Sequence, residues 1–327
     1  MKITFLGTSS GTPTLTRNVS GTAIQLTGRK EWILVDCGEG TQQQILRTRL
    51  SLVKLSAILL THLHGDHCYG LPGLLASAQL YGRTAPLLLV GPKETEPFVK
   101  SVMQYTEMHL DYPIEFIPVE EAAAFSCDAG LTVTPCPLSH RVDSFAYRFE
   151  ESRVPRTLLT EKLEQQGIEA GSVWWRLQKG ENVTLANGRV LQGDKYSKPG
   201  RKPRTVVIGG DNDRPELLEK VCRDADLLVH EATYTEPVLQ RVGEAPQHSS
   251  AARVAEFAEE IGLERLILTH FSPRYLNRAR NSRQLTVNDL RNEAAAIYQG
   301  DLWLARDFDQ FELTVNGELK RESLKKR

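Results

Sequence analysis

Six consecutive residues, His62 to His67, constrain this chain more than any other feature of its sequence. They place His62, His64, Asp66 and His67 directly behind the apolar run from Ala57 to Thr61. Such a run is typical of a buried strand, and strands of mixed α/β proteins present functional groups at their carboxyl ends. Neutral imidazole binds zinc and similar metals, and a carboxylate can complete or bridge such a site. Only eight histidines occur in 327 residues, so this cluster predicts a metal site, with a His-rich surface loop as the alternative.

The composition is that of a globular chain with a sizeable core, because 40% of the residues are apolar and 25% are charged. No apolar run approaches the length of a membrane helix, and the first residues resemble a strand rather than a signal peptide. Five cysteines without CxxC spacing predict buried thiols in a reducing compartment, so we expect a cytoplasmic protein. The net charge of −1 means that any RNA binding must come from local basic patches.

Four expected strands later in the chain are followed by further ligand-type residues. The strand 131–138 precedes His140, 205–208 precedes Asp211, 226–229 precedes His230 and Glu231, and 265–268 precedes His270. Two metal ions about 3.5–4 Å apart need about seven protein ligands when each keeps a water position and one carboxylate bridges them. The sequence offers seven: His62, His64, Asp66, His67, His140, Asp211 and His270. Asp211 is the natural bridge because it has two oxygens.

The section 151–204 differs from the rest. It holds 11 lysines and arginines against six acidic residues, whereas the whole chain is slightly acidic. It also contains a short helical pattern at 157–166, the pair Trp174-Trp175, and a hairpin-like stretch that turns at Asn187-Gly188. This composition predicts an inserted arm rather than a part of the core, and a solvated linker is the alternative.

Several of these motifs resemble a known family. Thr61 to His67 resembles the signature of the metallo-β-lactamase superfamily, and Asp36 to Gln42 and His230 to Thr233 are similar to motifs of the ribonuclease Z family, short form. The resemblance covers nearly the whole chain. It implies an α+β fold, the four-layer αβ/βα sandwich over residues 1–315, with 151–204 as an inserted flexible arm that binds transfer RNA. The basic tail 316–327 is expected to be frayed.

The resemblance also implies roles for individual residues. His62, His64 and His140 would hold one zinc, Asp66, His67 and His270 would hold the other, and Asp211 would bridge them. This gives two Zn²⁺ per subunit, which Mn²⁺ or Co²⁺ can replace. Asp66 would also orient or deprotonate the attacking water. His248 would act as the general acid for the leaving 3′-oxygen, and Glu231 would keep it protonated and oriented.

The implied reaction is removal of the 3′ trailer from precursor transfer RNA. Cleavage would fall after the discriminator nucleotide, leaving a 3′-hydroxyl on the transfer RNA and a 5′-phosphate on the trailer. The family is usually a homodimer, so a second copy is expected, with no membrane or DNA partner. Two rivals are another hydrolase of the superfamily, such as a phosphodiesterase or arylsulfatase, and an inactive RNA-binding scaffold.

Neighbouring residues have simpler interpretations. His230 is expected to be a core residue, Asp36 to orient a ligand loop, and His109 to lie on the surface. Cys68 follows His67 but is not expected to bind metal, because seven better ligands fill the site. His248 could merely flank the cap of the helix that follows it.

Substrate contacts are expected in two places. In the arm, Lys198, Arg201 and Lys202 supply the densest charge, and charge of this kind favours the RNA backbone. Near the amino terminus, Arg17 and Asn18 belong to the loop that the resemblance implies to lie at the substrate end. A further basic run, Arg274, Arg278, Arg280 and Arg283, is compatible with either RNA or solvent.

The chain departs from the family pattern at three points. Leu15 stands where a basic residue is usual in the substrate-end loop, which puts discrimination against CCA-ended RNA in doubt. Asn212 replaces a threonine after the bridging aspartate, so a hydroxyl contact is lost. In the arm, Gly171-Ser172 followed by Trp174-Trp175 replaces a Gly-Pro-rich segment.

Overall fold

The computed structural model describes residues 1–279 and 281–323 and divides into two compact units. The first unit comprises Met1–Glu150 with Arg204–Arg327, and the second is Glu151–Pro203. The chain therefore leaves the first unit once and returns to it. Each unit has its own core.

One sheet of the first unit contains eight strands in the order β19-β18-β1-β2-β3-β4-β5-β6. Their bounds are β1 (Lys2–Gly7), β2 (Gly21–Gln25), β3 (Trp32–Val35), β4 (Leu55–Leu59), β5 (Leu87–Gly91), β6 (Ile114–Pro118), β18 (Asp309–Leu313) and β19 (Leu319–Ser323). Strands β3 to β6 pair in parallel, and the remaining neighbours are antiparallel. The apolar run that precedes the histidine cluster is β4, in the parallel half.

The other sheet of this unit has seven strands in the order β17-β16-β15-β14-β9-β8-β7. They are β7 (Phe125–Cys127), β8 (Leu131–Leu138), β9 (Ser144–Glu151), β14 (Thr205–Ile208), β15 (Leu227–Glu231), β16 (Arg265–Thr269) and β17 (Asp301–Leu304). Strands β14 to β17 are parallel, so their carboxyl ends lie at one edge. This edge carries the residues that follow β14, β15 and β16.

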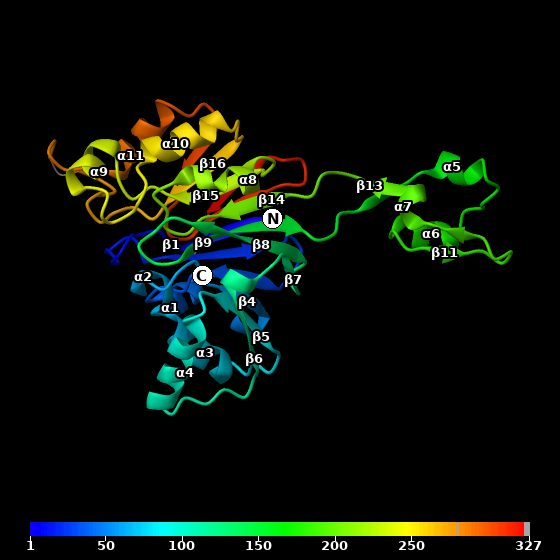
Figure 1. Cartoon of the computed structure of the whole chain (residues 1–327), viewed down its shortest axis with the longest axis horizontal. Helices are drawn as coiled ribbons and strands as arrows, with labels where there is room; N and C mark the ends of the chain where they lie inside the picture. The colour runs from blue at the N-terminus through cyan, green and yellow to red at the C-terminus, as the bar shows by residue number, and fades with distance from the viewer. Residues whose placement is uncertain (280, 324–327) are drawn as a thin grey trace. The chain divides into compact units, whose positions relative to one another are not determined.

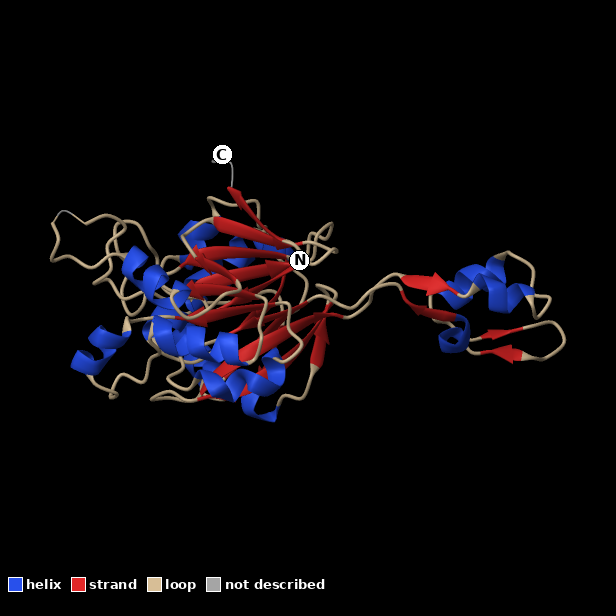
Figure 2. Ribbon diagram, turned by 90° about the horizontal axis from the view of Figure 1, so that it is seen from above, coloured by secondary structure: helices blue, strands red, loops and turns tan. Residues whose placement is uncertain are grey.

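The two sheets pack face to face, with helices on both outer faces (Figures 1 and 2). A core of apolar side chains from both sheets fills the space between them, including Phe5 and Phe311 from one sheet and Tyr147 and Phe149 from the other. One group of helices packs on the eight-stranded sheet: α1 (Thr41–Ile45), α3 (Leu71–Leu80) and α4 (Thr95–Tyr105). Another packs on the seven-stranded sheet: α8 (Glu219–Cys222), α9 (Glu236–Val242), α10 (Ala251–Glu260) and α11 (Val287–Ala295). The expected four-layer αβ/βα sandwich is confirmed.

Short helices complete this unit: α2 (Gly65–Cys68) and the 3₁₀ turns Leu52–Lys54, Val119–Glu121 and Pro215–Leu218. Two of the longer helices, α10 and α11, begin where the sequence supplies a cap. Ser250 caps α10 by accepting a hydrogen bond from the Arg253 amide, and Thr286 and Asp289 form a capping box at α11.

The carboxyl-terminal segment differs from its expected frayed form. Leu319–Ser323 is strand β19, which pairs antiparallel with β18. Its polar sequence does not predict a strand, but the edge of β18 offers backbone partners that the segment satisfies. The prediction of a frayed tail is therefore wrong for these residues, and 324–327 lie outside the described residues.

The second unit is a small α+β body with its own apolar core. Its elements are β10 (Arg156–Leu158), α5 (Thr160–Glu164), α6 (Ser172–Gln178), β11 (Val183–Thr184), β12 (Val190–Leu191), α7 (Gly193–Tyr196) and β13 (Ser197–Pro199). Its buried side chains are Leu163, Ile168, Leu177, Val183, Leu191 and Tyr196. The expected helix at 157–166 is wrong in its first part, because Thr157 pairs with Lys198 in β13. The hairpin of β11 and β12 turns at Asn187-Gly188, where Gly188 has a φ of +81°.

Two expectations from composition concern the cysteines and a membrane-spanning helix. All five cysteines are free thiols; Cys37, Cys68 and Cys222 are buried, whereas Cys127 and Cys136 are only partly buried. Within residues 1–279 and 281–323, no helix is long and apolar enough to span a membrane.

Candidate metal centre

The histidine cluster lies where β4 ends and α2 begins, beside the carboxyl ends of β14, β15 and β16. Two residues there have left-handed backbone conformations that side chains rarely adopt, Asp36 with φ +59° and His270 with φ +57°. Such conformations persist only when surrounding contacts enforce them, and they concentrate at functional sites. Both residues make several polar contacts within the cluster.

The first group of possible ligands comprises His62, His64, His140 and Asp211. The Nδ1 atom of His64 lies 3.1 Å from Nε2 of His62 and 3.1 Å from Nε2 of His140. Oδ2 of Asp211 lies 3.5 Å from Nε2 of His62 and 3.7 Å from Nε2 of His140. Four donor atoms from distant parts of the sequence therefore converge on one point.

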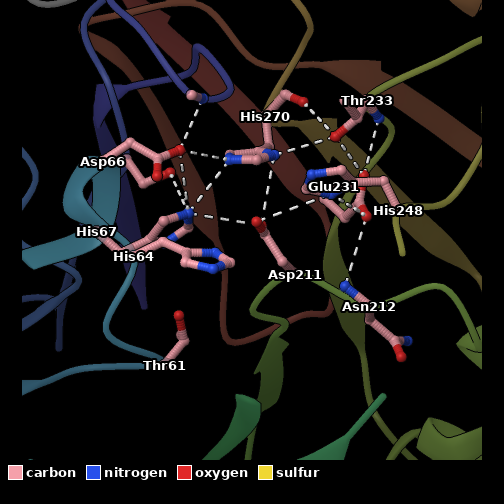
Figure 3. A network of polar contacts seen from close by, with 12 residues as sticks. Thr61, His64, Asp66, His67, Asp211, Asn212, Glu231, Thr233, His248 and His270 are labelled. Atoms are coloured by element: carbon pink, nitrogen blue, oxygen red, sulfur yellow. Dashed lines mark hydrogen bonds and ion pairs between the residues drawn. The ribbon is translucent and has the colours of Figure 1, made fainter. Parts of the chain in front are cut away.

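The second group comprises Asp66, His67 and His270. Nε2 of His67 lies 3.2 Å from Nε2 of His270, and Oδ2 of Asp66 lies 3.3 Å from the latter atom. The other oxygen of Asp211, Oδ1, lies 3.5 Å from Nε2 of His67. The two oxygens of Asp211 thus face different groups, as a bridging carboxylate requires. Figure 3 shows the contacts of Asp211 with His67, His270 and His248.

The donor set fits metal ions better than it fits hydrogen bonds. Two donors bound at about 2.0–2.1 Å to one tetrahedral zinc lie about 3.3 Å apart. The separations in both groups, from 3.1 to 3.7 Å, lie around this value. Hydrogen bonds cannot hold three imidazole nitrogens together if each presents a lone pair, because no proton then lies between them. A metal ion can.

Hydrogen bonds at the opposite nitrogen of two of these rings, those of His67 and His140, favour a lone pair on the nitrogen that faces the site. Nδ1 of His67 lies 2.8 Å from Oδ2 of Asp36, and Nδ1 of His140 lies 2.8 Å from the carbonyl oxygen of Gln247. Each Nδ1 therefore donates its proton outward, which leaves Nε2 with a lone pair toward the site. Asp36 also accepts hydrogen bonds from the amide and hydroxyl of Thr61, so it holds the ligand loop from behind.

His248 and Glu231 form a buried pair beside Asp211. Nδ1 of His248 lies 3.1 Å from Oε1 of Glu231 and 3.8 Å from Oδ2 of Asp211. Burial alone would lower the pKa of His248, but the two carboxylates outweigh burial and raise it to about 9. Burial alone would raise the pKa of Glu231, but His248 holds it below its ordinary value. The geometry thus favours a charged imidazolium next to the possible ligands.

The amide of Ser249 and the amide and hydroxyl of Thr233 also donate to Glu231, at 2.6 to 2.9 Å. Thr233 reaches His270 as well, because its hydroxyl lies 3.1 Å from the Nδ1 of that ring. The sequence predicted Thr233 as part of a motif but predicted no role for it. It also missed Gly11, whose amide donates to Oδ2 of Asp66 at 2.7 Å. No local pattern marks such a backbone donor, because the contact depends on the folded loop.

The expected core role of His230 agrees with its surroundings. His230 is fully buried, and Asn212 lies beside it with its side-chain nitrogen 3.2 Å from Nε2. The side-chain oxygen of Asn212 accepts from the amides of Ser139 and Arg214. The departure at Asn212 therefore exchanges a hydroxyl for an amide that makes several contacts. His109 is exposed, and the Cys68 thiol contacts the backbone oxygen of Leu63 rather than the ligand groups.

The two residues near the amino terminus that were expected to contact substrate, Arg17 and Asn18, both make hydrogen bonds within the fold. Arg17 is only 5% exposed and donates to Thr8, Ala305 and Asn277, so its end groups hold the loop instead of projecting toward a substrate. This argues against the predicted contact. Asn18 is partly buried and donates to the backbone oxygen of Glu39, which also ties it to the fold.

In the second unit, the three predicted contact residues are not equivalent. Lys198 and Lys202 are exposed, whereas Arg201 is partly buried and pairs with Glu151 through both terminal nitrogens. This ion pair neutralises Arg201 and argues against its predicted role. Among the four arginines of the later basic run, Arg274, Arg278 and Arg283 are exposed, and Arg280 lies outside the described residues.

The fold and the donor set together define a class. Residues 31–158 match the family model described as a Beta-lactamase superfamily domain. With two sheets between helices and possible metal ligands at the strand ends, this is the metallo-β-lactamase fold.

Full-length relatives narrow the class. Proteins named Ribonuclease Z from Marinobacter nauticus and Pseudomonas putida are 48% and 47% identical to this chain, over 98% of its length and 99% of theirs. The crystal structure of human tRNase Z, short form, superposes with a TM-score of 0.63 at 25% identity, covering 96% of this chain and 100% of that one. The chain belongs to the ribonuclease Z family.

Proposed function

We propose that this chain is the endoribonuclease that removes 3′ trailers from precursor transfer RNA. Family membership supports the activity, because the named relatives match over almost their whole length. The observation that carries the proposal is Asp211, whose two oxygens face two separate groups of ligand atoms while the Glu231–His248 pair lies alongside. Hydrolysis of a phosphodiester needs both an activated water and a proton for the leaving oxygen, and this arrangement offers residues for each.

The proposed cofactor is a pair of zinc ions, which the two groups of ligand atoms would hold together with Asp211. When bound, such ions supply Lewis acidity and lower the pKa of water. Asp66 is the proposed base, because its Oδ2 faces His67 and His270 and is fixed by the amide of Gly11. That hydrogen bond orients the carboxylate so that it can accept a proton from the attacking water.

His248 is the proposed general acid. Its Nδ1 is engaged by Glu231, so the proton on Nε2 can pass to the leaving 3′-oxygen. Glu231 stabilises the charged imidazolium before the proton is transferred. Because Glu231 also accepts a hydrogen bond from the amide of Ser249, the residue after His248, it fixes the orientation of His248 as well. Glu231 is thus proposed as a positioning residue and His248 as the group that meets the substrate.

The second unit is the proposed transfer RNA-binding arm. Its excess of lysine and arginine supports binding to the phosphate backbone, with exposed Lys198 and Lys202 as the remaining candidates for contact. We also propose that the enzyme acts in the cytoplasm, where its five free thiols stay reduced.

A homodimer is the proposed assembly. Leu46, Val53 and Tyr81 are exposed apolar side chains around one cavity of about 320 Å³, formed by α1, the following 3₁₀ turn and the end of α3. Clustered exposed apolar side chains are typical of protein interfaces. A second copy is the proposed occupant of this face.

The activity is tested by incubating the zinc-loaded protein with precursor transfer RNAs that carry or lack an encoded CCA, and by mapping the 3′ ends. We expect one cut after the discriminator nucleotide in the precursor without CCA. Leu15 is fully exposed and uncharged, so we also expect cleavage of the CCA-containing precursor. Intact RNA in both reactions would contradict the proposed function.

A further inference from the structure

A polar cavity lies in the first unit apart from the metal centre, and none of its lining residues belongs to the groups of possible metal ligands. It has a volume of about 330 Å³, which is at the small end of the range for ligand pockets. The loop after β1, helix α11, strand β17 and strand β19 all contribute to its wall. Its polar and aromatic lining includes Arg17, Arg291, Arg306, Arg321, Asp301 and Trp303.

The positive charge around this cavity is only partly compensated. Arg321 pairs with Asp309 at 2.6 Å. For Arg291 and Arg306, we find no side-chain hydrogen bond or ion pair with any residue in 1–279 or 281–323, and both side chains are exposed. Asp301 is the one carboxylate among the described lining residues. Like charges gathered around a concave surface attract anions from solution.

Two buried donors in the wall have no acceptor. Arg17 is 95% buried, and although its terminal nitrogens are bonded to Thr8, Ala305 and Asn277, its Nε has no partner among the described atoms. The indole Nε1 of Trp303 is likewise buried without a partner in the described part of the chain. Buried donors in native proteins are nearly always satisfied, so these two nitrogens are exceptions among the described residues of the wall.

We propose that this cavity binds the phosphate group of a nucleotide. Guanidinium groups match phosphate oxygens in geometry and charge, and Arg291 and Arg306 are the two that have no competing partner among the described residues. Asp301 accepts hydrogen bonds from ribose hydroxyls or base amino groups, so the mixed lining suits a nucleotide better than a bare polyanion. The phosphate comes either from a free nucleotide or from RNA. Only the RNA source rests on the proposed function.

The test is equilibrium dialysis of adenosine 5′-monophosphate against the full-length, zinc-loaded protein in a phosphate-free buffer. The metal centre can bind the nucleotide too, so stoichiometry is compared between the wild type and an R291A/R306A variant. We expect the variant to lose one equivalent, with its affinity weakened about tenfold or more. The matched control is R214A/R223A, which removes two exposed arginines outside the cavity and should bind like the wild type.

Circular dichroism verifies that each variant is folded, which is expected because all four arginines lie on the surface. Equal stoichiometry and affinity in the wild type and R291A/R306A would overturn the proposal. A 5′-phosphorylated RNA oligonucleotide is then added as a competitor. Displacement of the equivalent that depends on Arg291 and Arg306 supports the site and assigns its phosphate to RNA, whereas retention supports the site with a free nucleotide as its ligand.

Discussion

At the scale of single residues, Asp211 matters because it joins the two groups of ligand atoms. Its Oδ2 faces His62 of the first group, and its Oδ1 faces His67 of the second. Burial alone would raise the pKa of Asp211, yet the surrounding histidines hold it well below its ordinary value. Asp211 is therefore an ionised carboxylate that lies between two sets of imidazoles.

Replacing a possible ligand should remove metal and activity together. For His64→Ala or Asp211→Ala, we expect less than two zinc ions per chain by atomic absorption. We also expect a loss of precursor cleavage of more than about 100-fold, because even partners behind the ligands are typically worth about 10–100-fold. The matched control is His109→Ala, since that histidine is exposed and remote from both groups. Full cleavage by either ligand variant would refute the site assignment.

Asp307 should make stability depend on pH in a recognisable way. Burial raises its pKa to about 6, although hydrogen bonds from Asn18 and Thr8 and the charge of Arg17 act in the opposite direction. An unfolded aspartate has a pKa of about 3.9, so between about pH 4 and 6 the folded state binds more protons than the unfolded state. The contribution of Asp307 to the free energy of unfolding therefore falls as pH rises through this window.

Asp307→Asn removes that titration. Relative to the variant, the wild type should lose up to about 3 kcal/mol of stability between pH 4 and pH 7, since one pKa unit corresponds to about 1.4 kcal/mol. Urea unfolding of both proteins across this range measures the difference, and effects of other titrating groups cancel. A constant difference at every pH would show that Asp307 titrates alike in both states.

Arg17 illustrates which residue-scale features the sequence could not predict. The seven predicted ligands all belong to the groups of possible ligands, and they were predictable because each follows a strand or lies in one motif, and the carboxyl ends of parallel strands meet. Arg17 has an exposed, polar sequence context, yet it is buried against Ala305 and Asn277, more than 250 residues away. Contacts of that range are set by the packed fold and leave no local trace.

At the scale of elements, strands in the core were predicted better than those at the edge. Thr205–Ile208 was predicted with its observed bounds. All four of its side chains are buried, and each is therefore of an apolar or β-branched type that marks a strand in the sequence. Leu319–Ser323 was missed because its pairing with β18, not its polar sequence, makes it a strand. Helix α6 was missed around Trp174-Trp175, where Trp174 donates to the carbonyl of Ile168 inside the small core.

Removing the inserted unit should separate substrate binding from chemistry. Deletion of 160–200 removes six of the 11 lysines and arginines of section 151–204, Lys198 among them, so KM for precursor transfer RNA should rise about tenfold or more near 150 mM salt. Hydrolysis of a small phosphodiester, bis(p-nitrophenyl) phosphate, should change less than about twofold because the ligand groups are in the other unit. Equal losses on both substrates would contradict the role of the arm.

At the scale of the whole molecule, the exposed apolar face on α1 and α3 concerns assembly. Leu46→Asp places a charge in the proposed interface, so sedimentation velocity should shift from a dimer toward the 36.6 kDa monomer. Val315→Asp is the control, because Val315 is similarly exposed but follows β18. A monomeric wild type, or a dimer in both variants, would reject this face as the interface.

The place where the chain leaves and re-enters the first unit has a broader consequence. Glu150 and Thr205 are paired neighbours on β9 and β14, so everything between them closes a loop whose ends the sheet already holds together. The entropy needed to close such a loop grows only slowly with its length. Insertions of very different size are therefore almost equally tolerable there. Evolution, or a protein engineer, can exchange the second unit for another recognition module without rebuilding the first unit, which carries the ligand groups.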